Sequence, residues 1–416
     1  MTLTRVYLRT FGCRANQYDT EGVRDLVAAS GGTIVDRPED ATVAVFNSCA
    51  VTAAAESDLR RSIRQASRAN ASLRTLVMGC AAARDSGTIA ALPGVEHVIG
   101  GADMPAIAAA LGITQPTTTN GPAHQTATRA LLRIQDGCDE HCTFCATTLA
   151  RGANRSRPIH DLVHEAERLA DRHPEIVLTG IHIGSYGADI GTSLGALVER
   201  LIVSVPVVRF RLSSIEATEV DEQLLDSFIH ASRLAPHLHA PLQSGSDRLL
   251  KRMGRHWYTA TSYARCVERL TRNRPVFALG ADVITGFPGE TDADHRATCA
   301  LVDELPFTYL HVFPFSLRPG TAAERLADHV PAAIARDRAA ELRGIADSKH
   351  QSYVRSRVNH TADVVVVRGD VREGLTEDYL EVRMEGEGET LPRGSRVSAR
   401  LTMTEGVLTA TAFADR

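Results

Sequence analysis

Short apolar runs alternate with helical patterns over residues 1–110. The runs lie at 6–8, 43–46 and 76–78, and helical periodicity follows the first two over 20–30 and 53–69. This alternation predicts a parallel sheet, in which ligands bind beyond the carboxyl ends of the strands. A cysteine follows each run: Cys13, Cys49 and Cys80. We therefore expect the three cysteines to converge at one edge of the sheet, although they are far apart in the sequence.

Residues 129–320 contain a second, longer series of the same kind. The candidate strands lie at 130–135, 176–179, 207–212, 237–241, 277–284 and 308–313. Helical patterns fill the gaps, notably near 160–171, 193–203 and 258–272. Six such repeats predict a (β/α) barrel or part of one, with its site at the carboxyl ends of the strands. Residues 321–350 have a helical pattern that connects this region to the next.

The remaining segments differ in composition and in the pattern of apolar residues. Residues 111–128 contain little that could pack and are typical of a linker. From about 351, apolar or alternating runs stand between glycine-rich turns, at 364–367, 380–384, 397–403 and 407–413. The sequence thus predicts a multidomain α/β protein: an N-terminal parallel α/β domain (1–110), a linker (111–128), a central partial (β/α) barrel (129–350) and a small all-β domain (351–416).

Composition narrows the class of protein. The chain has 416 residues, of which 44% are hydrophobic and 23% charged, as in globular proteins. The first residues do not resemble a secretory signal, and no apolar stretch approaches the roughly 18–20 residues that a membrane span needs. We therefore expect a cytoplasmic protein without a membrane partner. Eight cysteines in such a chain favour metal or redox chemistry over disulfides.

Three cysteines stand close together directly after the first candidate barrel strand. Cys138, Cys142 and Cys145 have the spacing C-x3-C-x2-C. Three thiolates can hold a cubane iron–sulfur cluster and, without a nearby fourth cysteine, leave one iron open. An open position distinguishes catalytic from structural metal sites. The alternative is a zinc site that includes His141, but zinc motifs favour paired cysteines and the position after a barrel strand favours the cluster.

This loop resembles the signature of the radical S-adenosylmethionine superfamily, in which an aromatic residue, here Phe144, precedes the last cysteine. The resemblance implies that the open iron binds S-adenosylmethionine, whose reductive cleavage gives a 5′-deoxyadenosyl radical. Further residues match cofactor-binding elements of the superfamily in the same order: Gly180, Ser213, Glu216, Ile284 and Gly286. Gly180 would lie near the methionine amine, Ser213 and Glu216 near the ribose or methionine, and Ile284 and Gly286 near the adenine.

The combination of both cysteine triples with a C-terminal all-β domain resembles the methylthiotransferase family. The resemblance implies two [4Fe–4S] clusters: an auxiliary cluster on Cys13, Cys49 and Cys80, and a radical cluster on Cys138, Cys142 and Cys145. It also implies two uses of S-adenosylmethionine. One methylates a sulfur on the auxiliary cluster and the other generates the radical that removes hydrogen from the substrate, which then receives the methylated sulfur. For Cys266 and Cys299, which lie in helical patterns, buried packing is the simpler interpretation.

Short motifs favour one substrate branch. Residues 11–21 and 47–52 resemble the branch that adds a methylthio group to carbon 2 of threonylcarbamoyladenosine, at position 37 of tRNA. The branch acting on isopentenyladenosine usually has methionine where Ala15 stands, and the branch acting on a ribosomal protein aspartate has lysine. Both remain alternatives, and a non-catalytic, zinc-stabilised RNA-binding protein is a distant one. Thr148 and Ala81 stand where the family has proline and tyrosine.

The expected partners are tRNA and a reductant such as flavodoxin or ferredoxin. Arg151, Arg155 and Arg157 follow the cysteine loop, where the family has arginines near the substrate entrance. The segment 374–382 resembles the TRAM pattern, an RNA-binding module, although residues 351–416 contain nine arginines against eleven acids. Since the net charge is −4, contacts to RNA must come from local patches.

Overall fold

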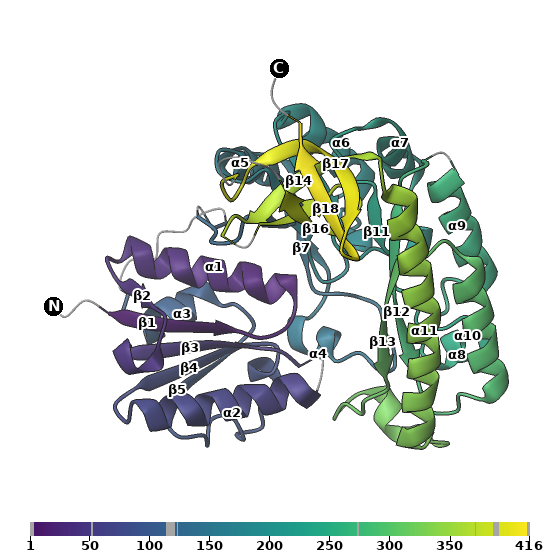
Figure 1. The fold of residues 1–416 in the computed structure, drawn as a ribbon. Helices are drawn as coiled ribbons and strands as arrows, with labels where there is room; N and C mark the ends of the chain where they lie inside the picture. Colours follow the sequence, from purple (N-terminus) through teal and green to yellow (C-terminus); the bar gives the residue numbers. More distant parts are fainter. Residues whose placement is uncertain are drawn as a thin grey trace.

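A computed structural model describes residues 4–50, 53–113, 121–122, 124–272, 274–370, 372–385 and 391–413. Part of the predicted linker 111–128, and the last two residues of the motif 47–52, lie outside the described residues. Figure 1 shows an N-terminal α/β part beside a larger central one, with a small β barrel from the end of the chain above their junction. The predicted multidomain α/β class is confirmed.

The N-terminal part is a five-stranded parallel sheet in the order β2-β1-β3-β4-β5. The elements are β1 (Arg5–Thr10), α1 (Arg14–Ala29), β2 (Thr33–Val35), β3 (Val43–Ser48), α2 (Ala53–Ala69), β4 (Arg74–Gly79), β5 (Val95–Gly100) and α3 (Met104–Ala110). Figure 1 shows α1 and α2 on opposite faces of this sheet. Strand β3 is buried throughout because Phe46 packs with Leu59 of α2, whereas Val45 packs with Val23 of α1. Such a strand has a continuous apolar run, as the sequence indicated.

Two features of this part differ from the prediction. Helix α1 begins at Arg14, not near Thr20, because the buried side chains of its first turns include Asn16 and Asp19, which hydrophobic periodicity does not register. Strands β2 and β5 were not predicted, since they lie at the edges of the sheet and are half-buried or exposed along most of their length.

The central part contains six parallel strands that form an open partial barrel. They are β6 (Ala130–Arg133), β9 (Glu175–Thr179), β10 (Arg209–Leu212), β11 (His237–His239), β12 (Ala278–Thr285) and β13 (Tyr309–Pro314). They form two three-stranded sheets, β10-β9-β6 and β11-β12-β13, which isolated bridges join between β10 and β11. The outer helices include α5 (Ile159–Ala170), α6 (Leu194–Ser204), α7 (Glu222–His230), α9 (Ala260–Arg272), α10 (Asp292–Glu304) and α11 (Ala332–Arg357). The predicted partial barrel is confirmed.

The chain leaves the first barrel strand earlier than predicted. After Arg133 it forms β7 (Gln135–Asp136), which pairs with β8 (Arg155–Ser156) and so brackets the loop that holds Cys138, Cys142 and Cys145. Helix α4 (Thr147–Arg151) closes this loop.

The C-terminal part is a closed barrel in the order β14-β15-β16-β18-β17. Its strands are β14 (Thr361–Arg368), β15 (Glu373–Thr376), β16 (Glu381–Glu385), β17 (Arg396–Thr404) and β18 (Val407–Ala412). Helix α11 runs to Arg357, so the strands begin about ten residues after the predicted boundary at 351. Closure leaves no exposed sheet edge in a domain of this size.

A buried polar cluster links the N-terminal part to the central part. Tyr18 of α1 donates a hydrogen bond to Glu165 of α5 at 3.0 Å, and Arg157 pairs with the same carboxylate at 2.7 Å. Among the residues that the structure describes, none of the helices combines the length and apolarity that crossing a lipid bilayer requires.

Candidate active site

Cys13, Cys49 and Cys80 lie together at the carboxyl edge of the N-terminal sheet. They follow β1, β3 and β4, which are neighbours in the sheet. The sulfurs of Cys13 and Cys80 each lie 4.0 Å from Asn16 Oδ1. The sulfur of Cys49 lies 2.6 Å from the point where a Cβ on Gly12 would stand. The strand order therefore brings the three cysteines together, as expected from the sequence.

The side chain of Asn16 organises this edge. Its amide nitrogen donates to Phe11 O and to Ser48 O, both at 2.9 Å. These carbonyls belong to the segments that lead into Cys13 and Cys49. Asn16 is fully buried, so its hydrogen bonds fix both turns relative to each other.

Arg151 reaches this edge from the central part. Its Nε donates to Cys80 Sγ at 3.3 Å, and its Nη2 donates to Asn16 Oδ1 at 2.7 Å and Asp19 Oδ2 at 2.8 Å. Burial raises the pKa of the Cys80 thiol, and the guanidinium of Arg151 opposes that rise. A cationic N–H donor at this distance stabilises negative charge on the sulfur.

The same guanidinium is also linked, through Asp136, to the loop that holds the second group of cysteines. Arg151 Nη1 donates to Asp136 Oδ1 at 3.2 Å, and that oxygen accepts the backbone N–H of Gly137 at 3.0 Å. Gly137 directly precedes Cys138. A single buried side chain, 2% exposed, thus joins the two cysteine sites.

Each cysteine of the loop 138–145 has a nitrogen beside its sulfur. Cys138 Sγ lies 3.6 Å from His182 Nδ1, Cys142 Sγ accepts from Arg255 Nη1 at 3.4 Å, and Cys145 Sγ accepts from the backbone N–H of Thr147 at 3.4 Å. Burial raises the pKa of Cys142 to about 12 against the charge of Arg255, and the nearby Cys145 and Cys138 add to the rise. The three cysteines therefore lie close enough to interact electrostatically.

His182 is a further ionisable group of this loop. Burial alone would lower its pKa, but contact with Cys138 and Glu219 raises the pKa of His182 to about 10. Its Nε2 lies 2.6 Å from Glu219 Oε1, an ion pair without good hydrogen-bond angles. Both contacts favour the protonated form of the imidazole.

The residues expected to bind S-adenosylmethionine lie at the carboxyl ends of barrel strands. Gly180 follows β9, and a Cβ there would come 2.8 Å from both Gln135 O and Gln135 Oε1, so this close approach requires glycine. Ser213 follows β10 and is nearly buried. The carboxylate of Glu216 is bound by Arg255 and by the indole N–H of Trp257.

The three other expected residues pack against neighbouring elements. Phe144 contacts Phe287 edge to face, with ring centroids 6.4 Å apart, and Ile284 packs in the same apolar cluster. Gly286 has φ +72°, and a Cβ there would meet Ala335 of α11. The glycine is therefore required by its packing on α11.

The prediction that three arginines after the loop contact RNA needs correction. Arg151 is buried and fully used by Asp19, Asp136 and Cys80, so it cannot contact a phosphate. Arg157 pairs with Glu165 and is 23% exposed. Arg155 is 61% exposed and lies 3.6 Å from Asp136, so it remains a candidate RNA contact.

Comparisons with known proteins agree with this arrangement. Residues 5–100 match the uncharacterized protein family UPF0004, and residues 132–302 match the radical SAM superfamily. The chain is 35% identical to the threonylcarbamoyladenosine tRNA methylthiotransferase MtaB of Thermotoga maritima, over 97% of this chain and 96% of that protein. It is 34% identical to the protein of the same name from Bacillus subtilis, over 92% and 91% of the two chains. The chain belongs to the tRNA methylthiotransferase family.

The chain is also similar to a relative with a different name and to a solved structure. A tRNA-2-methylthio-N(6)-dimethylallyladenosine synthase of Novosphingobium aromaticivorans is 34% identical over 87% of this chain and 86% of that protein. Among solved structures, the cobalamin-dependent S-adenosylmethionine radical enzyme OxsB matches with a TM-score of 0.51 and 12% identity, over 78% of this chain and 54% of that chain. The latter match concerns the fold alone.

This methylthiotransferase has residues that suit the cofactors of its family, iron–sulfur and S-adenosylmethionine. Thiolates are the ligands of iron–sulfur clusters, and hydrogen bonds to their sulfurs are one of the means by which a protein sets the reduction potential. His182, Arg255, Thr147 and Arg151 provide such donors. His141, the fourth ligand of the zinc alternative, is exposed. When bound, these cofactors supply a carbon radical able to remove hydrogen from an unreactive C–H bond.

Several residues of the methylthiotransferase site have no local signal in the sequence. Arg255 lies 113 residues from Cys142, and Asn16 lies 64 residues from Cys80, so no local spacing connects them. His182 offered a faint signal, since it stands two residues after Gly180 at a strand end. Convergence of this kind depends on the order of strands in the sheets, which a single sequence does not specify.

Proposed function

We propose that the protein adds a methylthio group to carbon 2 of threonylcarbamoyladenosine at position 37 of tRNA. The observation that supports this most is the link between two separate cysteine triples through the buried guanidinium of Arg151. Sulfur delivery and radical formation require two centres at a fixed separation, and positioning is a large source of rate enhancement. Such a reaction belongs in the cytoplasm, where tRNA is modified.

Each triple has a separate role in this proposal. Cys13, Cys49 and Cys80 hold an auxiliary [4Fe–4S] cluster, and Cys138, Cys142 and Cys145 hold the radical [4Fe–4S] cluster. A single metal ion requires ligand atoms that all lie within about 4.8 Å of one another. Among the described residues, two sets of side chains meet this condition, and neither contains any of the six cysteines. The three sulfurs of each triple are therefore not all within 4.8 Å of one another.

Residues at the carboxyl edge of the barrel would hold S-adenosylmethionine beside the cysteine loop. Ser213 and Glu216 stand at the carboxyl edge of the barrel, and Gly180, Ile284 and Gly286 shape the backbone there. Arg255 bridges Glu216 and Cys142, so it couples the cofactor-binding edge to the loop. Phe144 packs on Phe287, which anchors the loop to the segment that follows β12. The electron comes from a small reductant such as flavodoxin or ferredoxin.

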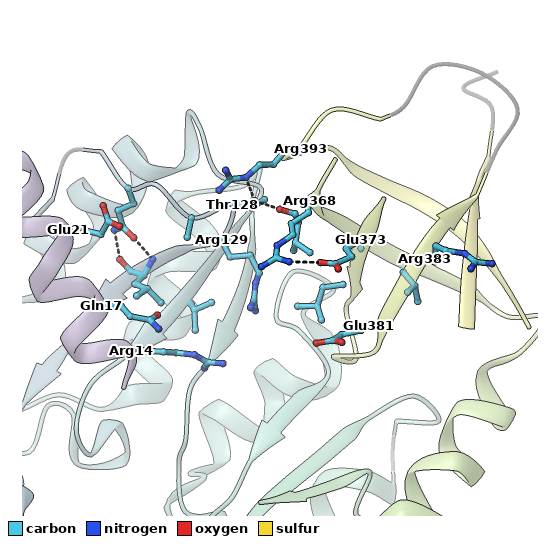
Figure 2. Close-up of a pocket in the computed structure, with 18 of the residues that line it drawn as sticks. Arg14, Gln17, Glu21, Thr128, Arg129, Arg368, Glu373, Glu381, Arg383 and Arg393 are labelled. Atoms are coloured by element: carbon cyan, nitrogen blue, oxygen red, sulfur yellow. Dashed lines mark hydrogen bonds and ion pairs between the residues drawn. The ribbon is translucent and has the colours of Figure 1, made fainter. Parts of the chain in front are cut away.

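A groove between the three parts of the protein suits the tRNA. It has a volume of about 1140 Å³ and is lined by five arginines and three glutamates. Figure 2 shows Arg14 and Glu21 of α1 on one side and Arg368, Glu373 and Arg383 of the C-terminal barrel on the other. None of the six cysteines lines this groove. The groove would therefore bind the RNA backbone, and a base that is splayed out of the single-stranded loop would reach the clusters. Arg155, outside the groove, would add a contact near the loop.

The assay that tests the proposal uses anaerobically reconstituted protein, S-adenosylmethionine and dithionite with tRNA that carries threonylcarbamoyladenosine. Nucleoside mass spectrometry should find the 2-methylthio derivative of this base. Product formed only on tRNA that carries isopentenyladenosine, or only on a ribosomal protein, would replace the proposal with the corresponding alternative.

A further inference from the structure

A polar layer crosses the interior of the central barrel half-way along its strands. Alternate residues of a strand share one face. On β12 and β13 the register pairs Ile284 with Phe313, Asp282 with His311, and Gly280 with Tyr309. A Cβ on Gly280 would meet the ring of Tyr309, which therefore lies across this interior face. The residues between them, such as Ala281 and Val283, are fully buried in the main core.

The layers differ in chemistry. Ile284 and Phe313 form an apolar layer near the carboxyl ends, and Ile284 packs in one cluster with Phe144 of the cysteine loop. Asp282 and His311 form the next layer, about 7 Å deeper in the barrel by the rise of two residues along a strand. The polar layer is thus within reach of a base that lies beside the cysteine loop.

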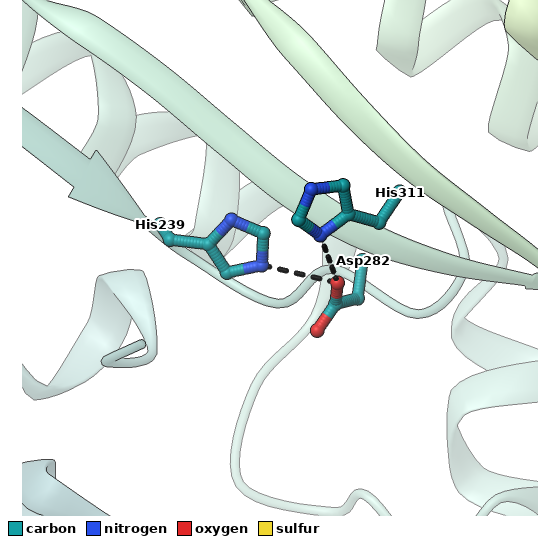
Figure 3. Close-up of side chains that lie close together, drawn as sticks. All are labelled: His239, Asp282 and His311. Atoms are coloured by element: carbon teal, nitrogen blue, oxygen red, sulfur yellow. Dashed lines mark ion pairs between the residues drawn. The ribbon is translucent and has the colours of Figure 1, made fainter. Parts of the chain in front are cut away.

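Three side chains of the polar layer contact one another. His239 Nε2 lies 3.1 Å from Asp282 Oδ1, and His311 Nδ1 lies 3.3 Å from the same oxygen. Figure 3 shows the two imidazoles converging on this atom, with the second carboxylate oxygen turned away from both rings. Below them, Tyr309 Oη lies 3.1 Å from His239 Nδ1 and 2.8 Å from His237 Nε2, which fixes the orientation of His239.

This layer is open to the interior of the barrel. The side chain of His311 is 55% exposed and that of Asp282 is 28% exposed, whereas His239 is 9% exposed. Phe313, in the layer above, is 46% exposed. An imidazole and a carboxylate oxygen are therefore accessible beneath an accessible aromatic ring, an arrangement that suits a base with a polar substituent.

We propose that His239, Asp282 and His311 form the subsite that recognises the substituent on N6 of the substrate adenine. The inference rests on the proposed function and deepens it. A threonylcarbamoyl group carries a hydroxyl and amide N–H groups, which suit Asp282, and a carboxylate, which suits an N–H donor on His311. An isopentenyl group has no polar atoms, so it would desolvate the carboxylate without replacing its hydrogen bonds.

The preference for the threonylcarbamoyl base over the isopentenyl base depends on polar groups of the subsite that the isopentenyl base would leave without hydrogen bonds. Hydrogen bonds to charged groups contribute about 1.5–3 kcal/mol each, or roughly 10- to 100-fold in affinity. A site built to bond a polar substituent rejects an analogue without it far more strongly than an apolar pocket rejects an added methylene. The polar layer therefore selects the threonylcarbamoyl over the isopentenyl base.

The experiment compares two tRNAs, one with threonylcarbamoyladenosine and one with isopentenyladenosine at position 37. The full-length reconstituted enzyme, H311F, D282N and H311Q are assayed by nucleoside mass spectrometry. We expect H311F and D282N to raise KM and lower kcat/KM for the first tRNA about 10- to 100-fold, and to narrow the preference between the two tRNAs. H311Q keeps a donor and should restore part of the loss. H164Q, an exposed histidine on α5, is the matched control.

The outcomes separate the two proposals. If the wild-type enzyme acts on the first tRNA and the variants keep its full preference, the subsite is wrong and the proposed function stands. If the wild-type enzyme acts on neither tRNA, both proposals fail. Iron content identifies any variant that does not fold. A divalent metal that is bound by the wild type and lost in D282N would make the group a metal site and overturn the inference.

Discussion

At the residue scale, Arg151 connects the two cysteine sites. Its five N–H groups have acceptors on Cys80, Asn16, Asp19 and Asp136, and these come from both cysteine sites. A planar, permanently charged fork can serve so many acceptors at once, whereas a lysine presents a single point charge. The sequence indicated a basic segment after the cysteine loop but not which arginine turns inward, because the acids that bind Arg151 lie far away in the chain.

Replacement of Arg151 by glutamine should weaken both the fold and the auxiliary site. Without the guanidinium, the buried Asp19 and the partly exposed Asp136 each lose a partner, which we expect to cost about 3 kcal/mol of unfolding free energy. Urea unfolding of the apoprotein would measure the loss of stability. The iron content of a protein in which Cys138, Cys142 and Cys145 are replaced would measure the loss at the auxiliary site. R155Q is the control, because Arg155 is exposed and lies in the same segment. Equal behaviour of the two variants would contradict a linking role for Arg151.

Gly12 gives a second test at this scale. Its φ of +95° and the Cβ position 2.6 Å from Cys49 Sγ mean that alanine would strain the turn and displace the cysteine. G12A should therefore lose iron from the auxiliary site. Gly112 also has a positive φ, of +74°, but no atom lies within 4 Å of its Cβ position. G112A should therefore keep the iron of the auxiliary site. If both variants lost that iron, the loss would come from strain in the backbone and not from displacement of Cys49.

At the element scale, the strands of the central barrel hold the C-terminal barrel in place. Glu175 of β9 is fully buried and pairs with Arg209 of β10 at 2.6 Å and Arg211 at 2.9 Å. Arg209 donates to Asp363 O at 2.6 Å, and Arg211 donates to Thr376 O at 3.1 Å. One carboxylate thus orients two arginines that reach the backbone of the neighbouring barrel. A sequence that alternates arginine with apolar residues predicts a half-exposed strand, and the burial of β10 on both faces could not be foreseen.

Loss of this carboxylate should have a large effect that depends on pH. Burial alone would raise the pKa of Glu175, but Arg211 and Arg209 hold it well below its usual value of 4.5. A depressed pKa in the folded state stabilises the protein above the unfolded pKa, and the benefit is lost as pH falls below it. E175Q should cost about 3–5 kcal/mol at neutral pH, and the difference from wild type should shrink in acid. E167Q, on the surface of α5, should match the wild type in denaturant titrations. A constant difference between E175Q and wild type across the pH range would contradict this assignment.

At the scale of the whole molecule, Tyr379 marks where the three parts meet. It comes from the C-terminal barrel with φ +68°, accepts a hydrogen bond from Arg14 of α1 at 3.2 Å and stacks on His237 of the central barrel at 4.4 Å. The three regions and both cysteine triples could be predicted from sequence, because local periodicity and short motifs specify them. The polar layer and the contacts of Tyr379 could not, because they depend on residues that are far apart in the sequence and meet only in the folded chain.

Iron and sulfide analysis of reconstituted protein tests whether the two cysteine triples hold two separate clusters, because it counts the metal bound by each triple. The wild type should bind about eight irons per chain, and each variant that lacks one triple, either Cys13, Cys49 and Cys80 or Cys138, Cys142 and Cys145, should bind about four. The variant that lacks both triples should bind none. Zinc in place of iron, or a loss of all iron when one triple alone is removed, would contradict two independent clusters joined by Arg151.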